Sequence, residues 1–153
     1  MVALEFTPGQ QAVWQRMQAA GAVLQVAVFQ TDGKFDPEAQ GREALLEAFR
    51  LWAHPVQGEP GKPTPMRFEE WTSGVLRQAL LDPPYSLVDS QPDDLWSSFR
   101  RHFISLPGPV LEVLSWGVHW SSYFEAGQEW WGSHCWTAHH RQLVTVMVAS
   151  STD

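Results

Sequence analysis

The C-terminal third of the chain alternates apolar and polar residues, and it also holds five of the nine tryptophans. A period of two is typical of β-strands, because successive side chains point to opposite faces of a sheet. The pattern predicts strands at residues 111–124, 128–139 and 143–150. A turn at residues 125–127, with Gly127 in a left-handed position, joins the first two strands. We therefore expect a three-stranded antiparallel meander in which Phe124 pairs with Gln128.

This register divides the meander into an apolar face and a polar face. The apolar face collects large side chains together with one alanine: Trp116, Val118, Trp120, Phe124, Trp130, Trp136 and Ala138. The polar face collects six residues that could bind a partner or a ligand: His119, Tyr123, Glu129, Trp131, Cys135 and His139. A slip of one residue would mix the two sets, which favours this register. The last strand is apolar on both sides, so we expect it inside the sheet.

Four segments before the meander have the pattern of amphipathic helices. Each opens with a capping-type residue near a proline, which suits the first helical turn because proline lacks the N–H that would be unpaired there. The helices are predicted at residues 8–20, 37–53, 65–81 and 92–105. Their apolar stripes each carry one tryptophan that we interpret as a core residue: Trp14, Trp52, Trp71 and Trp96. A short apolar run at residues 22–30 predicts a further strand beside the meander.

Together these elements predict one α+β domain over residues 1–153, with three to four helices packed on an antiparallel sheet of about four strands. The chain of 153 residues is long enough to bury one sizeable core. The element order, helices first and then a long meander, is similar to that of cone-shaped folds of the cystatin-like or nuclear-transport-factor type. That resemblance implies a concave sheet face serving as a pocket. The strand between the first two helices and the number of helices depart from the pattern.

The charge balance bears on the class of partner. Lysine and arginine number 10 against 17 acidic residues, for a formal net charge of −7. Nucleic-acid binding requires a basic stripe, which this sequence lacks. No segment approaches the roughly 18 apolar residues of a membrane helix, and the N-terminus lacks a signal-peptide pattern. A single cysteine, Cys135, fits a reducing compartment, so we expect a cytoplasmic protein.

The chemistry of the C-terminal residues does not identify a reaction. Their histidines and Cys135 match no zinc-ligand spacing, so we expect no metal and no cofactor. Cys135 could act as a nucleophile only with a base such as His119 within hydrogen-bond reach, and no local signature supports that pair.

Two functional hypotheses follow. The first is a non-enzymatic binding protein, for instance of the inhibitor or immunity type, whose acidic and tryptophan-rich C-terminal sheet face contacts a partner with a basic surface. A second copy of the chain could cover the same face as a homodimer. The alternative is a small-ligand-binding pocket protein or a small pocket enzyme with His119, Cys135 or His139 as acid–base groups. We favour the first.

Overall fold

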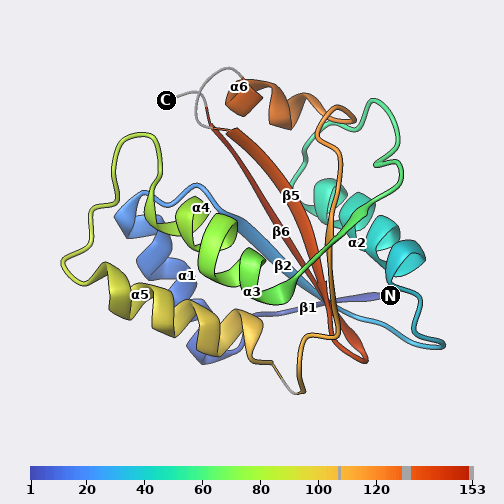
Figure 1. The fold of residues 1–153 in the computed structure, drawn as a ribbon, viewed down its shortest axis with the longest axis horizontal. Coiled ribbons are helices and arrows are strands. Elements are labelled where there is room, and N and C mark those ends of the chain that lie inside the picture. Colours follow the sequence, from blue (N-terminus) through green and yellow to red (C-terminus); the bar gives the residue numbers. More distant parts are fainter. Residues whose placement is uncertain (107, 129–131, 152–153) are drawn as a thin grey trace.

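The computed structural model describes residues 1–106, 108–128 and 132–151. Its centre is one six-stranded antiparallel sheet with the strand order β1-β2-β6-β5-β4-β3 (Figure 1). The strands are β1 (Val2–Leu4), β2 (Gln25–Gln30), β3 (Thr64–Met66), β4 (Glu112–Ser115), β5 (Gly132–His139) and β6 (Leu143–Ser151). The predicted α+β class is confirmed, but the sheet has six strands instead of about four.

The helical segments occupy the four predicted places and one more. The α-helices are α1 (Pro8–Ala20), α2 (Pro37–Leu51), α3 (Phe68–Glu70), α4 (Arg77–Leu81), α5 (Pro92–Phe99) and α6 (Glu125–Gln128). Two π-helical segments, η1 (Trp71–Leu76) and η2 (Arg100–Ile104), continue α3 into α4 and extend α5, and η3 (Ser122–Phe124) is a 3-10 turn. The third helix begins later than predicted, because residues 64–66 pair with β4 as a strand.

Local capping explains why α1 has the predicted bounds. The Thr7 hydroxyl accepts the backbone N–H of Gln10, and the Gln10 side chain accepts the backbone N–H of Thr7. This capping box satisfies two of the N–H groups that a helix start leaves unpaired. At the other end Gly21 has a φ of 83°, a left-handed conformation that glycine adopts without a steric penalty.

Helices cover both faces of the sheet (Figure 1). On one face α1, η1, α4, α5 and η2 form a core with the sheet residues Val26, Val28, Val113, Trp136, Ala138, Met147 and Ala149. On the other face α2 packs over Phe29, Leu114, Cys135, Val144, Val146 and Val148. β6 contributes to both cores, which confirms its predicted place inside the sheet. The predicted strand at residues 22–30 is also confirmed, since β2 pairs with β6.

The predicted register between the first two meander strands is wrong by one residue. Ser115, not Trp116, lies opposite Trp136, and the Trp116 N–H donates to the carbonyl of Cys135. Because side chains alternate, this shift places Trp116 on the same face as Cys135. The face that carries Trp136 is the opposite one.

The cause is that β4 ends at Ser115 and the following residues leave the sheet. The Ser121 hydroxyl accepts the Tyr123 N–H and donates to the carbonyl of Pro55. The Gln57 N–H donates to the carbonyl of Trp120 at 2.8 Å. These contacts satisfy backbone groups that a strand would pair, so η3 and α6 occupy the place of the predicted hairpin turn.

No helix in the described ranges combines the length and the apolar character needed to cross a membrane.

Close packing of α2 on the sheet depends on Gly41. A Cβ placed on Gly41 would lie 2.7 Å from Trp116 Cζ2 and 3.0 Å from Thr137 Oγ1. We expect Gly41→Ala to lower the free energy of unfolding by about 1–3 kcal/mol, because the helix must move away from the sheet. Urea titration followed by tryptophan fluorescence measures this loss.

Gly74 in η1 supplies the matched control, since a Cβ there meets no atom within 4 Å. Gly74→Ala should leave stability unchanged or raise it by up to about 1 kcal/mol. Equal destabilisation by the two substitutions would contradict the packing argument.

Candidate functional site

Of the six residues predicted to form the polar face, the structure describes four, and three of these, Tyr123, Cys135 and His139, lie on the side of the sheet that α2 covers. Cys135 and His139 lie beneath α2, exposed by only 1% and 0% of their surface. Tyr123 lies in η3 and is half-buried, while His119 is exposed on the segment between β4 and η3. Glu129 and Trp131 lie outside the described residues. The described members therefore do not form one open sheet face.

The sheet face that α2 covers contains a hydrogen-bonded chain of polar side chains. The Trp116 indole N–H donates to Thr137 Oγ1 at 2.9 Å, and the same oxygen lies 2.7 Å from His139 Nε2. No hydrogen-bond partner within the described ranges meets His139 Nδ1. Burial, aided by His140 next to it, lowers the pKa of His139 to about 4. This histidine stays neutral near pH 7 and is fully buried in the folded protein.

The neutral state of His139 gives the protein a specific sensitivity to acid. The unfolded chain binds a proton on His139 below about pH 6.5, whereas the folded chain binds it only near pH 4. Stability is therefore complete above about pH 6.5 and falls as the pH drops toward 4, by about 2–3 kcal/mol for this residue.

His139→Gln should shrink the difference in unfolding free energy between pH 7 and pH 4.5, measured by urea titration at each pH. His140 titrates in both proteins, so the change in slope isolates His139. An unaltered pH dependence in the variant would show that other groups cause the acid sensitivity.

Cys135 is equally unsuited to catalysis in the folded protein. Its burial raises the pKa of the thiol well above the ordinary value, which keeps the sulfur protonated and weakly nucleophilic. His119 is exposed to water, whereas the Cys135 sulfur is buried beneath α2. Among the residues that the structure describes, no three His, Cys, Asp or Glu side chains are grouped so as to hold a metal ion.

The aromatic residues around η3 form a packed cluster with the end of α2. Phe49 contacts the rings of Trp52, His54, Trp120, Tyr123 and Phe124 at centroid distances from 4.5 to 5.9 Å. The His54 ring stacks on Tyr123 at 4.4 Å, and its Nε2 lies 2.7 Å from Gln25 Oε1. These contacts close the seam between α2 and the sheet, so the main role of this aromatic cluster is structural.

The loop between α4 and α5 presents apolar side chains to water. We call residues 82–91 the Tyr85 loop. Tyr85 and Val88 are each 78% exposed, while Pro83 is buried and Leu87 packs against the core. Ser86, between them, has a φ of 67°, and its N–H donates to the carbonyl of Pro83. A left-handed serine is uncommon and marks a backbone that its surroundings hold in place.

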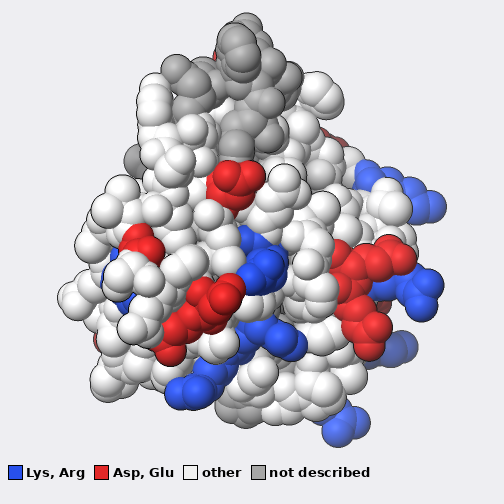
Figure 2. All heavy atoms as spheres, turned by 60° about the vertical axis from the view of Figure 1, so that its left-hand side comes forward, with Lys and Arg blue, Asp and Glu red and all other residues white. Residues whose placement is uncertain are grey.

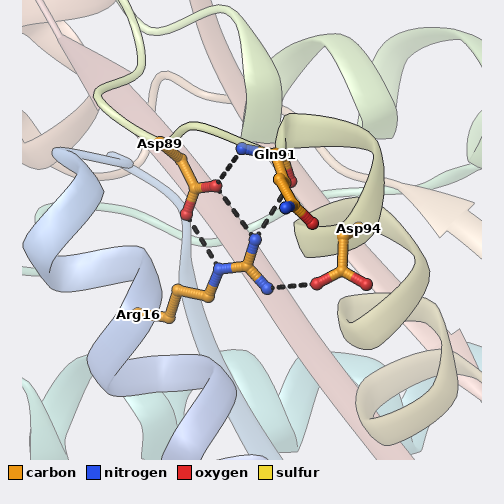
Figure 3. A network of polar contacts seen from close by, with 4 residues as sticks. All are labelled: Arg16, Asp89, Gln91 and Asp94. Atoms are coloured by element: carbon orange, nitrogen blue, oxygen red, sulfur yellow. Dashed lines mark hydrogen bonds and ion pairs between the residues drawn. The ribbon is translucent and has the colours of Figure 1, made fainter.

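Arg16 of α1 anchors the far end of this loop (Figure 3). Its guanidinium donates two hydrogen bonds to the Asp89 carboxylate at 2.8 and 2.9 Å, one to Asp94 at 2.7 Å and one to the carbonyl of Gln91 at 3.0 Å. The Gln91 N–H donates to the same Asp89 carboxylate. Arg16, and then the Gln91 N–H, lower the pKa of Asp89 to about 2. The network fixes the Tyr85 loop to α1 and to the start of α5.

The segment around the loop is acidic. Residues 82–94 contain four aspartates, Asp82, Asp89, Asp93 and Asp94, and no lysine or arginine. Arg16 and Arg77 compensate part of this charge, since Arg77 pairs with Asp93 at 2.8 Å. Figure 2, which brings the α1 and α5 side forward, shows acidic and basic side chains interspersed over much of this surface.

Comparison with protein-family models, with curated proteins and with solved structures yields no match to this chain.

The Tyr85 loop is not among the sites predicted from the sequence. The helix predicted at residues 65–81 ends just before it. The available signal is an aromatic and a β-branched residue, Tyr85 and Val88, set among proline, serine and aspartate residues that favour turns.

The ion pair between Arg16 and Asp89 predicts a second loss of stability in acid. Because the folded-state pKa of Asp89 is lowered, its contribution is complete above about pH 4 and is lost as the pH falls through about 2. Asp89→Asn should reduce the free energy of unfolding at pH 7 by about 1–2 kcal/mol, and this deficit should vanish toward pH 2. Thermal unfolding between pH 2 and 7 measures the deficit at pH 7 and its disappearance toward pH 2.

Asp93 is the matched control, since its carboxylate is 88% exposed in the pair with Arg77, against 11% for Asp89. Asp93→Asn should cost less than about 0.5 kcal/mol at any pH. A deficit for Asp89→Asn that persists at pH 2 would show that the anchor does not depend on the carboxylate charge.

Proposed function

We propose that the protein is a non-enzymatic binding protein that contacts a partner protein through the Tyr85 loop. The observation that carries this proposal is the exposure of Tyr85 and Val88 on a loop anchored from both ends. Pro83 and Leu87 hold one end against the core, and Arg16 holds the other. Such a loop loses little conformational entropy on binding, which strengthens association.

Tyrosine is a suitable anchor for such a contact. It provides a large contact area with few rotatable bonds, and it combines an apolar ring with a polar hydroxyl. Val88 extends the apolar contact, and the left-handed Ser86 directs the chain between the two. The loop is anchored at both ends while its tip stays exposed to water. This favours a role in recognition over a role in the core.

The charges around the loop favour a partner with basic groups. Asp82, the first residue of the loop, and Asp93, just after it, are exposed, and the whole chain carries a net charge of −7. Lysine or arginine side chains around an apolar recess would complement this surface, and the attraction would accelerate association. The inhibitor or immunity type of protein expected from the sequence is consistent with this surface, although the contact moves from the C-terminal sheet face to the loop.

The pocket hypothesis receives less support. It needs Cys135 or His139 to meet a ligand, and α2 covers both. His119 is exposed to water, whereas Cys135 and His139 are both buried.

A photo-reactive phenylalanine analogue at position 85 tests the proposal in an extract of the source cells. The same analogue at position 111 is the control, because Leu111 is 54% exposed elsewhere on the surface. We expect one protein to be cross-linked from position 85 and not from position 111.

The affinity of that protein should then fall by about tenfold or more in Tyr85→Ala, with no change in melting temperature, and should decrease with rising salt. The same dissociation constant for Tyr85→Ala and for the wild type, or no cross-link specific to position 85, would refute this function.

A further inference from the structure

One row of paired residues crosses the whole sheet at Ala138. From β1 to β3 the row consists of Leu4, Val28, Thr145, Ala138, Val113 and Met66. Paired residues point to the same face, and Val28, Ala138 and Val113 belong to the core between the sheet and the layer of α1, α4 and α5. Ala138 is the smallest side chain of the row, so the sheet fills least of this core layer at that point.

Two buried side chains beside Ala138 carry polar atoms without a partner. Thr145 lies directly opposite Ala138 and is 0% exposed. His140 follows on the same face, because its N–H donates to the carbonyl of Leu143 and continues the ladder, and it is 2% exposed. Within the described ranges, Thr145 Oγ1 and His140 Nδ1 meet no hydrogen-bond donor or acceptor.

The contact of His140 with η2 determines which of its ring nitrogens carries the proton. Nε2 lies 3.0 Å from the carbonyl oxygen of Ile104, which can only accept, so Nε2 is the donor. Burial lowers the pKa of His140, so the ring is neutral near pH 7. Nδ1 is therefore an acceptor that lacks a donor.

A third polar atom without a partner comes from the helical layer above. After Met66 the chain leaves the sheet for α3 and η1, which lie over this face (Figure 1). Trp71, the first residue of η1, is 0% exposed, and its ring packs edge-on against Trp136 at 6.4 Å between centroids. Trp136 precedes Ala138 on the same face of β5, so the indole lies over this part of the row. No acceptor among the described residues meets Trp71 Nε1.

The three atoms are complementary to one small polar ligand. Trp71 Nε1 only donates, His140 Nδ1 accepts, and the Thr145 hydroxyl can do either. A water molecule offers two donors and two acceptors, and buried waters typically make about three hydrogen bonds to groups that would otherwise be unpaired. Burial of polar atoms without partners is costly, which favours one occupant that satisfies all three.

We propose that a buried water molecule binds beside Ala138 and bridges Thr145 Oγ1, His140 Nδ1 and Trp71 Nε1. The water joins the start of η1 to the end of the hairpin between β5 and β6. Through His140 the same chain of hydrogen bonds reaches the carbonyl of Ile104 in η2. The site lies in the core and does not rest on the proposed function of the Tyr85 loop.

Nuclear Overhauser spectra between water and the isotope-labelled full chain detect this molecule directly. We expect cross-peaks to water from the Trp71 indole proton and from the Thr145 methyl group. Their signs should be opposite in the laboratory-frame and rotating-frame experiments, which distinguishes a bound water from proton exchange. The Trp116 indole proton is the control, because it donates to Thr137 Oγ1 at 2.9 Å and should give no such cross-peak.

Two substitutions at Thr145 separate the hydroxyl from the shape of the side chain. Thr145→Val keeps the shape but removes one partner of the water. The Trp71 cross-peak should therefore be lost, and the melting temperature should fall by about 2–8 °C. Thr145→Ser keeps the hydroxyl and should retain the cross-peak. Tyr85→Ala should leave the cross-peaks unchanged, which separates this site from the proposed function.

A hydroxyl that is unpaired in solution predicts the reverse result, since its replacement by valine would raise the melting temperature. That rise, or the absence of the cross-peaks in the wild type, would overturn the proposal. A less stable Thr145→Val combined with a wild type that shows no water contact would identify a direct bond between Thr145 and His140, and would overturn it as well.

Discussion

Burial of β6 on both of its faces is the constraint on which the rest of the structure depends. Val144, Val146 and Val148 enter one core, while Met147 and Ala149 enter the other. A strand that is apolar on both sides is stable only inside a sheet whose two faces are both covered. The helices therefore divide into two layers, with α2 and the short η3 on one side and α1, α4 and α5 on the other (Figure 1).

Elements with strong local signals could be predicted from the sequence, but the register between β4 and β5 could not. Thr7, Pro8 and Gly21 determine both ends of α1 through contacts within a few residues. The apolar run of β6 is equally local. The register at β4 depends instead on the contacts of Ser121 with Pro55 and of Gln57 with Trp120, between segments far apart in sequence. Alternation alone fits either register, so the pattern of tryptophans favoured the wrong one.

The same distinction explains the candidate sites. A period of two divides residues between two faces but does not say which face a helix covers, so the sequence left open that Cys135 and His139 lie under α2. The Tyr85 loop depends on a bond between Arg16 and Asp89, which are 73 residues apart. The turn-forming residues of the loop could have indicated its exposed tip. The contacts that anchor the loop can be seen only in the folded structure.

The strand order interleaves the two halves of the chain. β1, β2 and β3 come from the first half and flank β6, β5 and β4 from the second. On its inner side β2 has no partner until β6 is in place, since Val26 pairs with Met147. During translation the early segments must therefore wait, with their apolar surfaces uncovered, until the late strands leave the ribosome. Assembly through such distant pairings is slow and exposes the nascent chain to aggregation.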